Sequence, residues 1–305
     1  MAKNFGSLLK SAQSKGPVKL AVAVAQDPDV LKAVKDATNL AIIDPILVGD
    51  GDEIEKVAKD IDFDISGLEI IHEEDKTKAA RLATELVSSG KAQVLMKGLV
   101  DTSIIMKQVL DPEIGLRSGN VISHVGVIDI PTYHKLFALT DGAMILAPNL
   151  DVKKQIIENA VKVFHALGIE KPKVAVIAAK EKVDEKMEAT LHARDLKEMN
   201  IKGEITGCIV DGPFALDNAV SKRSAEIKGI DSPVAGDADI VLVPNIESGN
   251  VLYKSLTFLG NAKSAGLIVG TKAPIVVTSR ADNNEAKLNS IALAAMMCNR
   301  GGIDG

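Results

Sequence analysis

Short runs of aliphatic and β-branched residues alternate along this chain with longer amphipathic segments, and this alternation restricts the fold more than any other feature. The first run, 18–25, leads through Asp27 into a predicted helix that ends near Asn39. Three further runs each precede a predicted helix, at 45–49, 68–72 and 92–98. Four strand-helix units in a row predict a parallel sheet with right-handed crossovers, so the expected fold class is α/β.

The composition agrees with this fold class and narrows the function. The chain has no Trp, two Tyr and six Phe, so its core depends on the Val, Ile, Leu and Ala that are typical of buried parallel strands. A hydrophobic fraction of 46% with 25% charged residues is that of a globular protein. No apolar run is long enough to predict a membrane-spanning helix, so a membrane is not expected as a partner. The net charge of -5 argues against a nucleic-acid partner but allows an anionic ligand at a local cationic cluster.

A change of pattern predicts two domains. After the turn-rich segment 111–120, three strand-like stretches follow without a helix between them, at 121–130, 135–140 and 142–148. The alternation then returns, with strands expected at 173–179, 204–210, 239–244, 265–270 and 274–279. Helices are expected between these strands, among them 215–225 and 248–259. The last strand and helix are too short to form a domain alone. We therefore expect a first domain of 1–119 plus 267–305 and an inserted second domain of 120–266.

Ligands of open α/β sheets bind beyond the carboxyl ends of the strands, so polar and charged residues at these ends are the candidates for a binding site. The segment TSRAD places Ser279, Arg280 and Asp282 between a strand and a helix, which brings a hydroxyl, a fixed cation and a carboxylate into one turn. Helix capping is the alternative interpretation of the same residues. The suitability of Arg for bidentate phosphate recognition favours the functional interpretation.

Two further cationic segments follow predicted strands. Lys97 and Gly98 directly follow an apolar run, and Lys107 lies on the next helix. Segment 245–255 offers a second group that suits an anion, namely Ser248, Gly249, Asn250 and Lys254. The alternatives are a Lys97 side chain that extends to solvent at a sheet edge, a Lys107 side chain that points to water, and an exposed lysine in an ordinary strand-to-helix loop for 245–255.

The remaining reactive residues give weaker signals. No histidine has a second ligand at metal-binding spacing, so no metal site is expected, and only His124, next to Ser123, is a candidate for ligand contact. Cys208 and Cys298 lack redox or metal spacing, and 1–16 does not resemble a secretory signal, so we expect a cytoplasmic protein with reduced thiols. The usual dinucleotide, nucleoside-triphosphate and hydrolase motifs are absent.

Two long segments carry a family resemblance. SPVAGDADIVLVPNIESGNVLYKSL (232–256) and PIVVTSRAD (274–282) resemble the phosphate acyltransferase family of phosphotransacetylases and phosphotransbutyrylases. Segments 94–110 and 210–221 are more similar to the butyryltransferase branch than to the acetyltransferase branch. The similarity extends over nearly the whole chain.

This resemblance implies a two-domain, three-layer α/β/α fold like that of isocitrate and isopropylmalate dehydrogenases. It also implies reversible transfer of an acyl group between coenzyme A and inorganic phosphate, with acyl-CoA and acyl phosphate as the partners. Coenzyme A is then a substrate, no tightly bound cofactor or strictly required metal is expected, and a homo-oligomer is the family expectation. By the same resemblance, Arg280 holds the phosphate and Ser279 hydrogen-bonds the thiol sulfur or the developing oxyanion.

The chain departs from the acetyl branch at two places. The Asp that lies seven residues past the Ser in that branch is Ala286 here, with Glu285 beside it and Asp282 closer to the strand. The identity of the thiol base therefore stays open among Asp282, Glu285 and none. An Arg of the acetyl branch is also missing after the fourth strand, where Lys107 and Lys97 are the candidates to take over its anion contacts.

The expected activity is therefore phosphate butyryl transfer, with three alternatives. An acetyl-specific enzyme of the same family differs only in the size of the acyl pocket. A metal-dependent dehydrogenase on a related fold would need a carboxylate cluster and a nucleotide loop. A non-catalytic binding protein would hold coenzyme A or acyl phosphate without turnover.

Overall fold

The computed structural model describes residues 2–278 and 282–298. Its internal contacts divide these residues into two compact units. Unit A consists of Phe5–Asn120 and the chain from Ala265, and unit B consists of the chain up to Asn4 and Val121–Ser264. That unit B acts as a domain inserted into unit A stays our proposal.

The sheet of unit A has the strand order β3-β2-β1-β4-β11-β10. Its strands are β1 (Val18–Ala23), β2 (Ile43–Gly49), β3 (Glu69–His72), β4 (Val94–Lys97), β10 (Lys263–Val269) and β11 (Ile275–Val276). The pairs among β3, β2, β1, β4 and β11 are parallel, as the strand-helix alternation predicts. Strand β10 is antiparallel to β11, because only a short turn joins the two.

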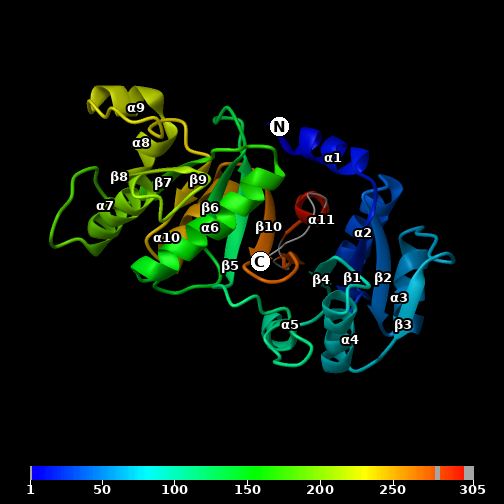
Figure 1. Ribbon diagram of the computed structural model, residues 1–305. Helices are drawn as coiled ribbons and strands as arrows, with labels where there is room; N and C mark the ends of the chain where they lie inside the picture. The colour runs from blue at the N-terminus through cyan, green and yellow to red at the C-terminus, as the bar shows by residue number, and fades with distance from the viewer. Residues whose placement is uncertain (1, 279–281, 299–305) are drawn as a thin grey trace. The chain divides into compact units, whose positions relative to one another are not determined.

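Helices lie against both faces of this sheet (Figure 1). They are α1 (Phe5–Ser14), α2 (Pro28–Asn39), α3 (Gly51–Asp60), α4 (Lys76–Ser88), α5 (Thr102–Val109) and α11 (Asn284–Cys298). Contacts join α2 to α3 and α11, and α11 to α1, whereas α4 contacts α5. Capping carboxylates start three of them: Asp27 accepts the N–H of Val30 at 2.9 Å, Asp50 that of Asp52 at 3.1 Å, and Asp75 that of Lys78 at 2.8 Å.

Unit B has the strand order β5-β6-β9-β7-β8. Its strands are β5 (Ser123–Asp129), β6 (Phe137–Thr140), β7 (Lys173–Ile177), β8 (Ile209–Phe214) and β9 (Ile240–Leu242). Its helices are α6 (Leu150–Ala166), α7 (Glu188–Ile201), α8 (Leu216–Val220), α9 (Lys222–Ile227), α10 (Ile246–Lys254) and the π-helical turn η1 (Ser255–Leu259). Only β5 and β6 pair antiparallel, and β6, β9, β7 and β8 pair in parallel.

The predicted strand at 142–148 is wrong, and the one at 204–210 is wrong in part. The stretch 142–148 forms turns, because the carboxylate of Asp141 accepts the N–H groups of Ala143 and Met144 at 2.8 and 2.9 Å and takes them out of any strand ladder. Segment 204–208 also lies outside β8. There the side-chain amide of Asn200 donates to the carbonyls of Ile205 and Cys208 at 3.0 and 3.1 Å, which holds the segment as a loop.

Two predicted helices also differ from the structure. The helix expected at 215–225 is interrupted at Ser221, whose backbone is extended and whose hydroxyl caps α9. The helix expected from 248 to 259 begins at Ile246, because Asn245 provides the cap, and continues beyond Lys254 as η1. Helix α1 was not predicted.

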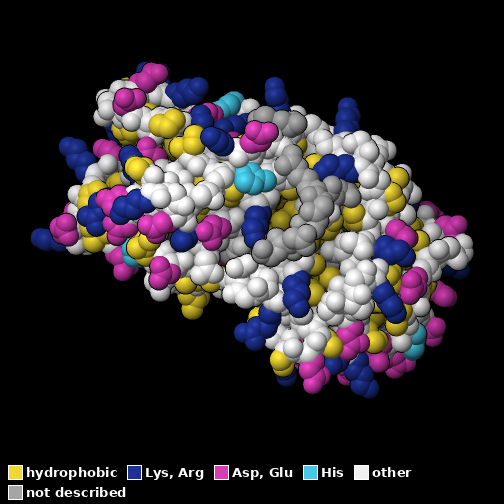
Figure 2. Space-filling model, in the orientation of Figure 1, with side chains coloured by type: hydrophobic (Ala, Val, Ile, Leu, Met, Phe, Trp, Pro, Cys, Tyr) yellow, Lys and Arg dark blue, Asp and Glu magenta, His cyan; other side chains and the backbone are white. Residues whose placement is uncertain are grey.

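The length of the helices and the distribution of surface charge are relevant to the membrane and nucleic-acid partners that the sequence argues against. None of the helices in the described part of the chain is both long enough and apolar enough to span a lipid bilayer. On the face drawn in Figure 2, the Lys and Arg side chains of the described residues are interspersed with Asp and Glu. That distribution agrees with the near balance of 36 basic and 41 acidic residues.

Candidate active site

Unit A contains a cavity of about 140 Å³ at the carboxyl ends of β1, β4 and β11. It is lined by residues that follow these strands or belong to the adjoining helices: Asp27, Asp29, Val30, Lys97, Gly98, Leu99, Thr278 and Lys287. One water needs roughly 10–15 Å³ of such space, and a whole drug-sized ligand needs roughly 300–1,000 Å³. The cavity is therefore of a size for a small group such as phosphate.

Lys97 brings a positive charge to this cavity, as the sequence predicts for the end of this strand. Its side chain is buried, and the residue is only 7% exposed. Its Nζ donates to the carbonyls of Gly98 and Val100 at 3.2 and 3.0 Å. Lys97 is thus a buried lysine that lines a cavity, and the alternative of a solvated surface lysine is wrong for it.

Position 98 requires a glycine, because the ends of β1 and β4 come so close together there that a side chain has no room. Its N–H donates to the carbonyl of Ala23 at 2.8 Å, and a Cβ at this position would lie 2.2 Å from the carbonyl oxygen of Val24. Val24 itself has a φ of 58°, in the left-handed region that a β-branched residue rarely adopts. Such strain persists only where the surroundings hold the backbone firmly, and it is common at functional sites.

The amino end of α2 also contributes to the cavity, through Asp29 and Val30. The unpaired N–H groups and the dipole at a helix N-terminus favour anions. The Asp27 carboxylate accepts the N–H of Val30, and the Asp29 carboxylate lies 3.8 Å from the Nζ of Lys32. Both acidic groups that line the cavity therefore have partners of their own.

The predicted residues around the end of β11 have different outcomes. Ser279 and Arg280 lie outside the described residues, directly after the cavity-lining Thr278. Asp282 is half-buried, and its main-chain carbonyl accepts a hydrogen bond from the Nζ of Lys287. Glu285 is exposed on the first turn of α11.

Lys107 lies on α5 with an exposed side chain and does not line the cavity. Lys287 does line it, although the sequence analysis did not select it. The sequence did contain a sign of this, because Lys287 lies in the segment AKLNSIALAAMM, in which most residues are small or apolar. A lysine within such an apolar pattern is a stronger sign of a site than a lysine on a charged helix face, because the charge of a buried lysine has to be compensated.

Unit B brings Ser123 and His124 to the carboxyl end of β6. Because β5 runs antiparallel to β6, the start of β5 lies beside the end of β6. The main-chain N–H of His124 donates to a carboxylate oxygen of Asp141 at 2.9 Å, and the hydroxyl of Thr140 donates to the His124 carbonyl at 2.8 Å. The hydroxyl of buried Ser123 accepts a hydrogen bond from the Asn159 amide at 3.0 Å.

The start of α10 adjoins the same strand end. Gly249 lies so close to Gly142 that a Cβ on Gly249 would be 2.7 Å from the Gly142 Cα. The Asn250 side-chain amide donates to the Gly142 carbonyl at 3.3 Å. Ser248 is exposed in the first turn and Lys254 is exposed in the last, so these two lie on the helix surface.

Both cysteines are poor nucleophiles at neutral pH. Burial raises the pKa of the Cys208 thiol to about 11 and that of the Cys298 thiol to about 12. Since the thiolate is the reactive form, both residues are inert structural thiols near pH 7. Within the described residues, no group of three or more His, Cys, Asp or Glu is arranged to hold a metal ion.

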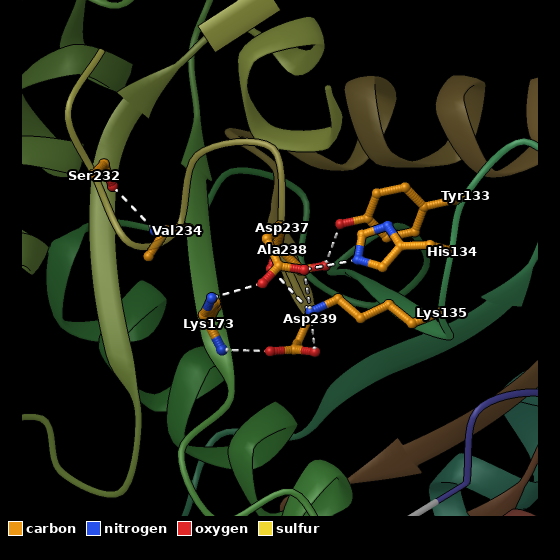
Figure 3. A network of polar contacts seen from close by, with 9 residues as sticks. All are labelled: Tyr133, His134, Lys135, Lys173, Ser232, Val234, Asp237, Ala238 and Asp239. Atoms are coloured by element: carbon orange, nitrogen blue, oxygen red, sulfur yellow. Dashed lines mark hydrogen bonds and ion pairs between the residues drawn. The ribbon is translucent and has the colours of Figure 1, made fainter. Parts of the chain in front are cut away.

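A second polar cluster lies at the opposite, amino-terminal ends of β6, β7 and β9 (Figure 3). Lys135 Nζ lies 3.0 Å from the carboxylate of Asp237 and 2.7 Å from that of Asp239. Lys173 Nζ and His134 Nε2 contact the Asp237 carboxylate at 2.6 and 2.7 Å. This cluster joins three strand ends and lies away from the ends where ligands of parallel sheets bind.

The cluster changes the ionisation of its members. Burial alone would raise the pKa of Asp237, but hydrogen bonds from Lys173, Lys135 and His134 outweigh it and hold that pKa well below its usual value. Burial, with the nearby carboxylates of Asp237 and Asp239, raises the pKa of Tyr133. Tyr133 stays a neutral donor and binds the Ala238 carbonyl at 2.8 Å.

These features define an α/β protein with a small polar cavity at the strand ends, lined by two lysines and two aspartates. The chain matches the profile described as "Phosphate acetyl/butaryl transferase" over residues 5–81 and 73–295. This chain belongs to that family, and the predicted resemblance is confirmed.

Individual relatives agree with this assignment. The chain is 51% identical over 297 residues to a phosphate butyryltransferase of Clostridium acetobutylicum, which covers 97% of this chain and 99% of the relative. It is 46% identical over 289 residues to a phosphate acetyltransferase of Thermotoga maritima, with 95% and 98% covered.

Solved structures agree with the fold. A branched-chain phosphotransacylase from Enterococcus faecalis matches with a TM-score of 0.80 and 34% identity, over 92% of this chain and 99% of that one. A 4-hydroxythreonine-4-phosphate dehydrogenase from Klebsiella pneumoniae matches with a TM-score of 0.58 and 12% identity, over 92% and 99%, which shows the fold alone. The expected α/β class with a dehydrogenase-like architecture is confirmed.

Proposed function

We propose that this chain is a phosphate butyryltransferase, which transfers a short or branched acyl group between coenzyme A and inorganic phosphate. The observation that carries the proposal is the 51% identity to a phosphate butyryltransferase over nearly the full length of both chains. The cavity of phosphate size in unit A supports it from the chemistry of the site, because the buried lysines Lys97 and Lys287 line it. The family assignment decides against the dehydrogenase alternative.

Lys97 binds the phosphate group in this proposal. Its buried ammonium reaches the cavity from β4, where a fixed positive charge is little screened by solvent. Gly98 and Leu99 donate their N–H groups to the β1 end at 2.8 Å each, which fixes the backbone that carries Lys97. The amino end of α2 adds its partial positive charge to the same anion.

Ser279 and Arg280 carry out the transfer itself. In the sequence they directly follow Thr278, which lines the cavity. The guanidinium of Arg280 neutralises the phosphate as the carbonyl is attacked, and Ser279 hydrogen-bonds the sulfur or the oxyanion. Lys107 contacts a more distant anionic group of coenzyme A.

Asp282 receives the thiol proton, with Glu285 as the alternative base. A thiol with a pKa near 8.5 is mostly protonated at neutral pH, so a carboxylate close to the sulfur promotes attack. Asp282 is half-buried and lies next to Lys287, whereas Glu285 is exposed.

A group of residues in unit B forms a further set of candidate substrate contacts within that unit. The group consists of Ser123, His124, Ser248, Gly249, Asn250 and Lys254. The close packing of Gly249 on Gly142 and the hydrogen bond of Asn250 to the same glycine give this strand end a firm backbone. In this proposal the two exposed polar residues of α10, Ser248 and Lys254, contact the polar parts of coenzyme A.

The reaction is a direct displacement in a ternary complex. The sulfur of coenzyme A attacks the carbonyl carbon of the acyl phosphate, its proton passes to the base, and the C–O bond to phosphate then breaks. In the reverse direction, a phosphate oxygen attacks the thioester carbonyl and the thiolate leaves. No enzyme thiol takes part, in agreement with the raised pKa values of Cys208 and Cys298.

Acyl preference, assembly and location are the finer parts of the proposal. Relatives at 51% and 46% identity have butyryl and acetyl names, so an acetyl-specific enzyme is the second candidate. Two additional methylenes are worth about 0.8 kcal/mol each when buried, which is a small discrimination. A cytoplasmic homo-oligomer without a tightly bound cofactor completes the proposal.

Release of free coenzyme A thiol from butyryl-CoA tests the activity. We expect release that depends on added phosphate, persists in EDTA and yields butyryl phosphate in equal amount. Release without phosphate would indicate a hydrolase instead. No release in a folded sample would contradict the proposal and favour the binding-protein alternative.

A further inference from the structure

Lys287 is a buried lysine that lines the cavity of unit A and has no role in the reaction proposed for the other residues. It lies in the first turns of α11, and only 4% of the residue is exposed. Lysines are almost never buried to this extent unless a partner compensates the charge. The surroundings of its ammonium group therefore indicate what it binds.

The protein compensates this charge only partly. The Nζ of Lys287 donates one hydrogen bond, to the main-chain carbonyl of Asp282. Within the described residues, no carboxylate forms an ion pair with it. An ammonium has three N–H donors, so a single neutral carbonyl leaves both charge and donors for another acceptor.

The cavity provides the space for that acceptor. Lys287 and Lys97 both line it, Lys97 at the end of β4 and Lys287 on α11. Two carboxylates line it as well, and each has a contact of its own, because Asp27 caps α2 and Asp29 lies 3.8 Å from Lys32. Two buried ammonium groups at one small cavity favour a small anion whose oxygens accept hydrogen bonds from both.

The cavity wall is also firm enough to select such a ligand. Gly98 packs on Val24 with no room for a Cβ, and Val24 is held at a φ of 58°. A preformed cavity binds without the free-energy cost of ordering its groups. These two contacts keep Lys97 at a fixed place on the side formed by β4.

We propose that Lys287 is a further substrate-binding residue, whose ammonium group binds the transferring phosphate together with Lys97. This inference deepens the proposed function and rests on it. The phosphate of inorganic phosphate or of the acyl phosphate occupies the cavity in the ternary complex. The hydrogen bond to Asp282 orients the ammonium toward that phosphate.

Steady-state kinetics of Lys287→Met test the inference, because Met keeps the length of the side chain and removes its charge. We expect the KM for phosphate to rise roughly tenfold or more, as for loss of a hydrogen bond to a charged group, and the KM for butyryl-CoA to stay within twofold. Lys35→Met is the matched control, since Lys35 also donates to a main-chain carbonyl, that of Ile61 at 2.8 Å, outside the cavity. An unchanged phosphate KM in folded Lys287→Met, or an equal rise in Lys35→Met, would overturn the proposal.

A measurement on the unaltered protein covers the case that the variant does not fold. Crystals soaked in arsenate, a phosphate analogue, locate the anion by its anomalous scattering. We expect a peak within hydrogen-bond distance of the Nζ atoms of Lys287 and Lys97, and a peak elsewhere only would overturn the inference. If the unaltered protein lacks phosphate-dependent release of coenzyme A, the proposed function fails, while the arsenate position still decides whether Lys287 binds an anion.

Discussion

Lys97, at the end of β4, and Lys287, on α11, line the same cavity of unit A, although they are far apart in the sequence. The fold produces this relationship because β4 pairs with β11, and α11 follows β11. Both residues are less than a tenth exposed, so their charges act in surroundings from which most water is excluded. Charge-assisted hydrogen bonds are strong in such surroundings.

Replacement of Lys97 by Ala should weaken phosphate binding, because one of the two cavity ammonium groups is lost. We expect the KM for phosphate to rise about tenfold, with a smaller effect on the KM for acyl-CoA. Initial rates over a phosphate series measure the effect, and Lys56→Ala, on the exposed face of α3, is the control. A phosphate KM equal to that of the control would reduce Lys97 to a structural residue.

Replacement of Arg280 by Ala should lower kcat by at least roughly a hundredfold, because the developing charge loses its fixed cation. Arg223→Ala, an exposed arginine of α9 in unit B, should leave kcat unchanged. Single-turnover rates with saturating substrates measure the chemical step. Near-normal kinetics in a folded Arg280 variant would remove this residue from the mechanism.

Single replacement of Cys208 or of Cys298, by Ser or by Ala, should leave turnover intact. With a pKa of about 11, only about one Cys208 thiol in 10⁴ is ionised at pH 7, which is too few for an efficient nucleophile. Turnover should be compared with the melting temperature, because both residues are partly or fully buried. Loss of turnover in a variant that melts like the unaltered protein would mean that a thiol acts in catalysis.

Replacement of Asp237 by Asn should destabilise unit B at neutral pH by about 1–3 kcal/mol. The reason is that His134, Lys135 and Lys173 lose the carboxylate that they contact. The folded-state pKa of Asp237 is depressed, so its contribution is complete above the ordinary unfolded value of about 3.9. It disappears as the pH falls through the lower, folded-state pKa. The free energy of unfolding of the variant should therefore change less with pH below about 4.

Urea unfolding at a series of pH values measures this prediction. Asp44→Asn is the control, because Asp44 forms an exposed ion pair with Lys19 at 3.5 Å, and such pairs contribute about 0–1 kcal/mol. Equal stability of the two variants at pH 7 would show that the cluster contributes no more than a surface ion pair.

Much of the fold follows from local signals in the sequence. The Asp residues before α2, α3 and α4 cap these helices as acidic residues at such positions are expected to. The errors occur where a side chain replaces a main-chain partner. Asp141 and Asn200 bind main-chain groups that a strand would use, and an apolar sequence gives no sign of this.

The site was less predictable than the fold. Lys97 and Gly98 are visible from their place after an apolar strand, and the structure places both at the cavity. Lys287 is not visible in this way, because its burial depends on the packing of α11 against α2, α1 and β11. The roles of Ser279 and Arg280 come from the family resemblance, and their positions lie outside the described residues.

The most direct test of the account compares kcat/KM for acetyl-CoA, butyryl-CoA and isobutyryl-CoA in one phosphate-dependent assay of coenzyme A release. The account predicts activity on all three, with the highest kcat/KM for the four-carbon substrates. A clear preference for acetyl-CoA would contradict the butyryl assignment and make the chain a phosphate acetyltransferase.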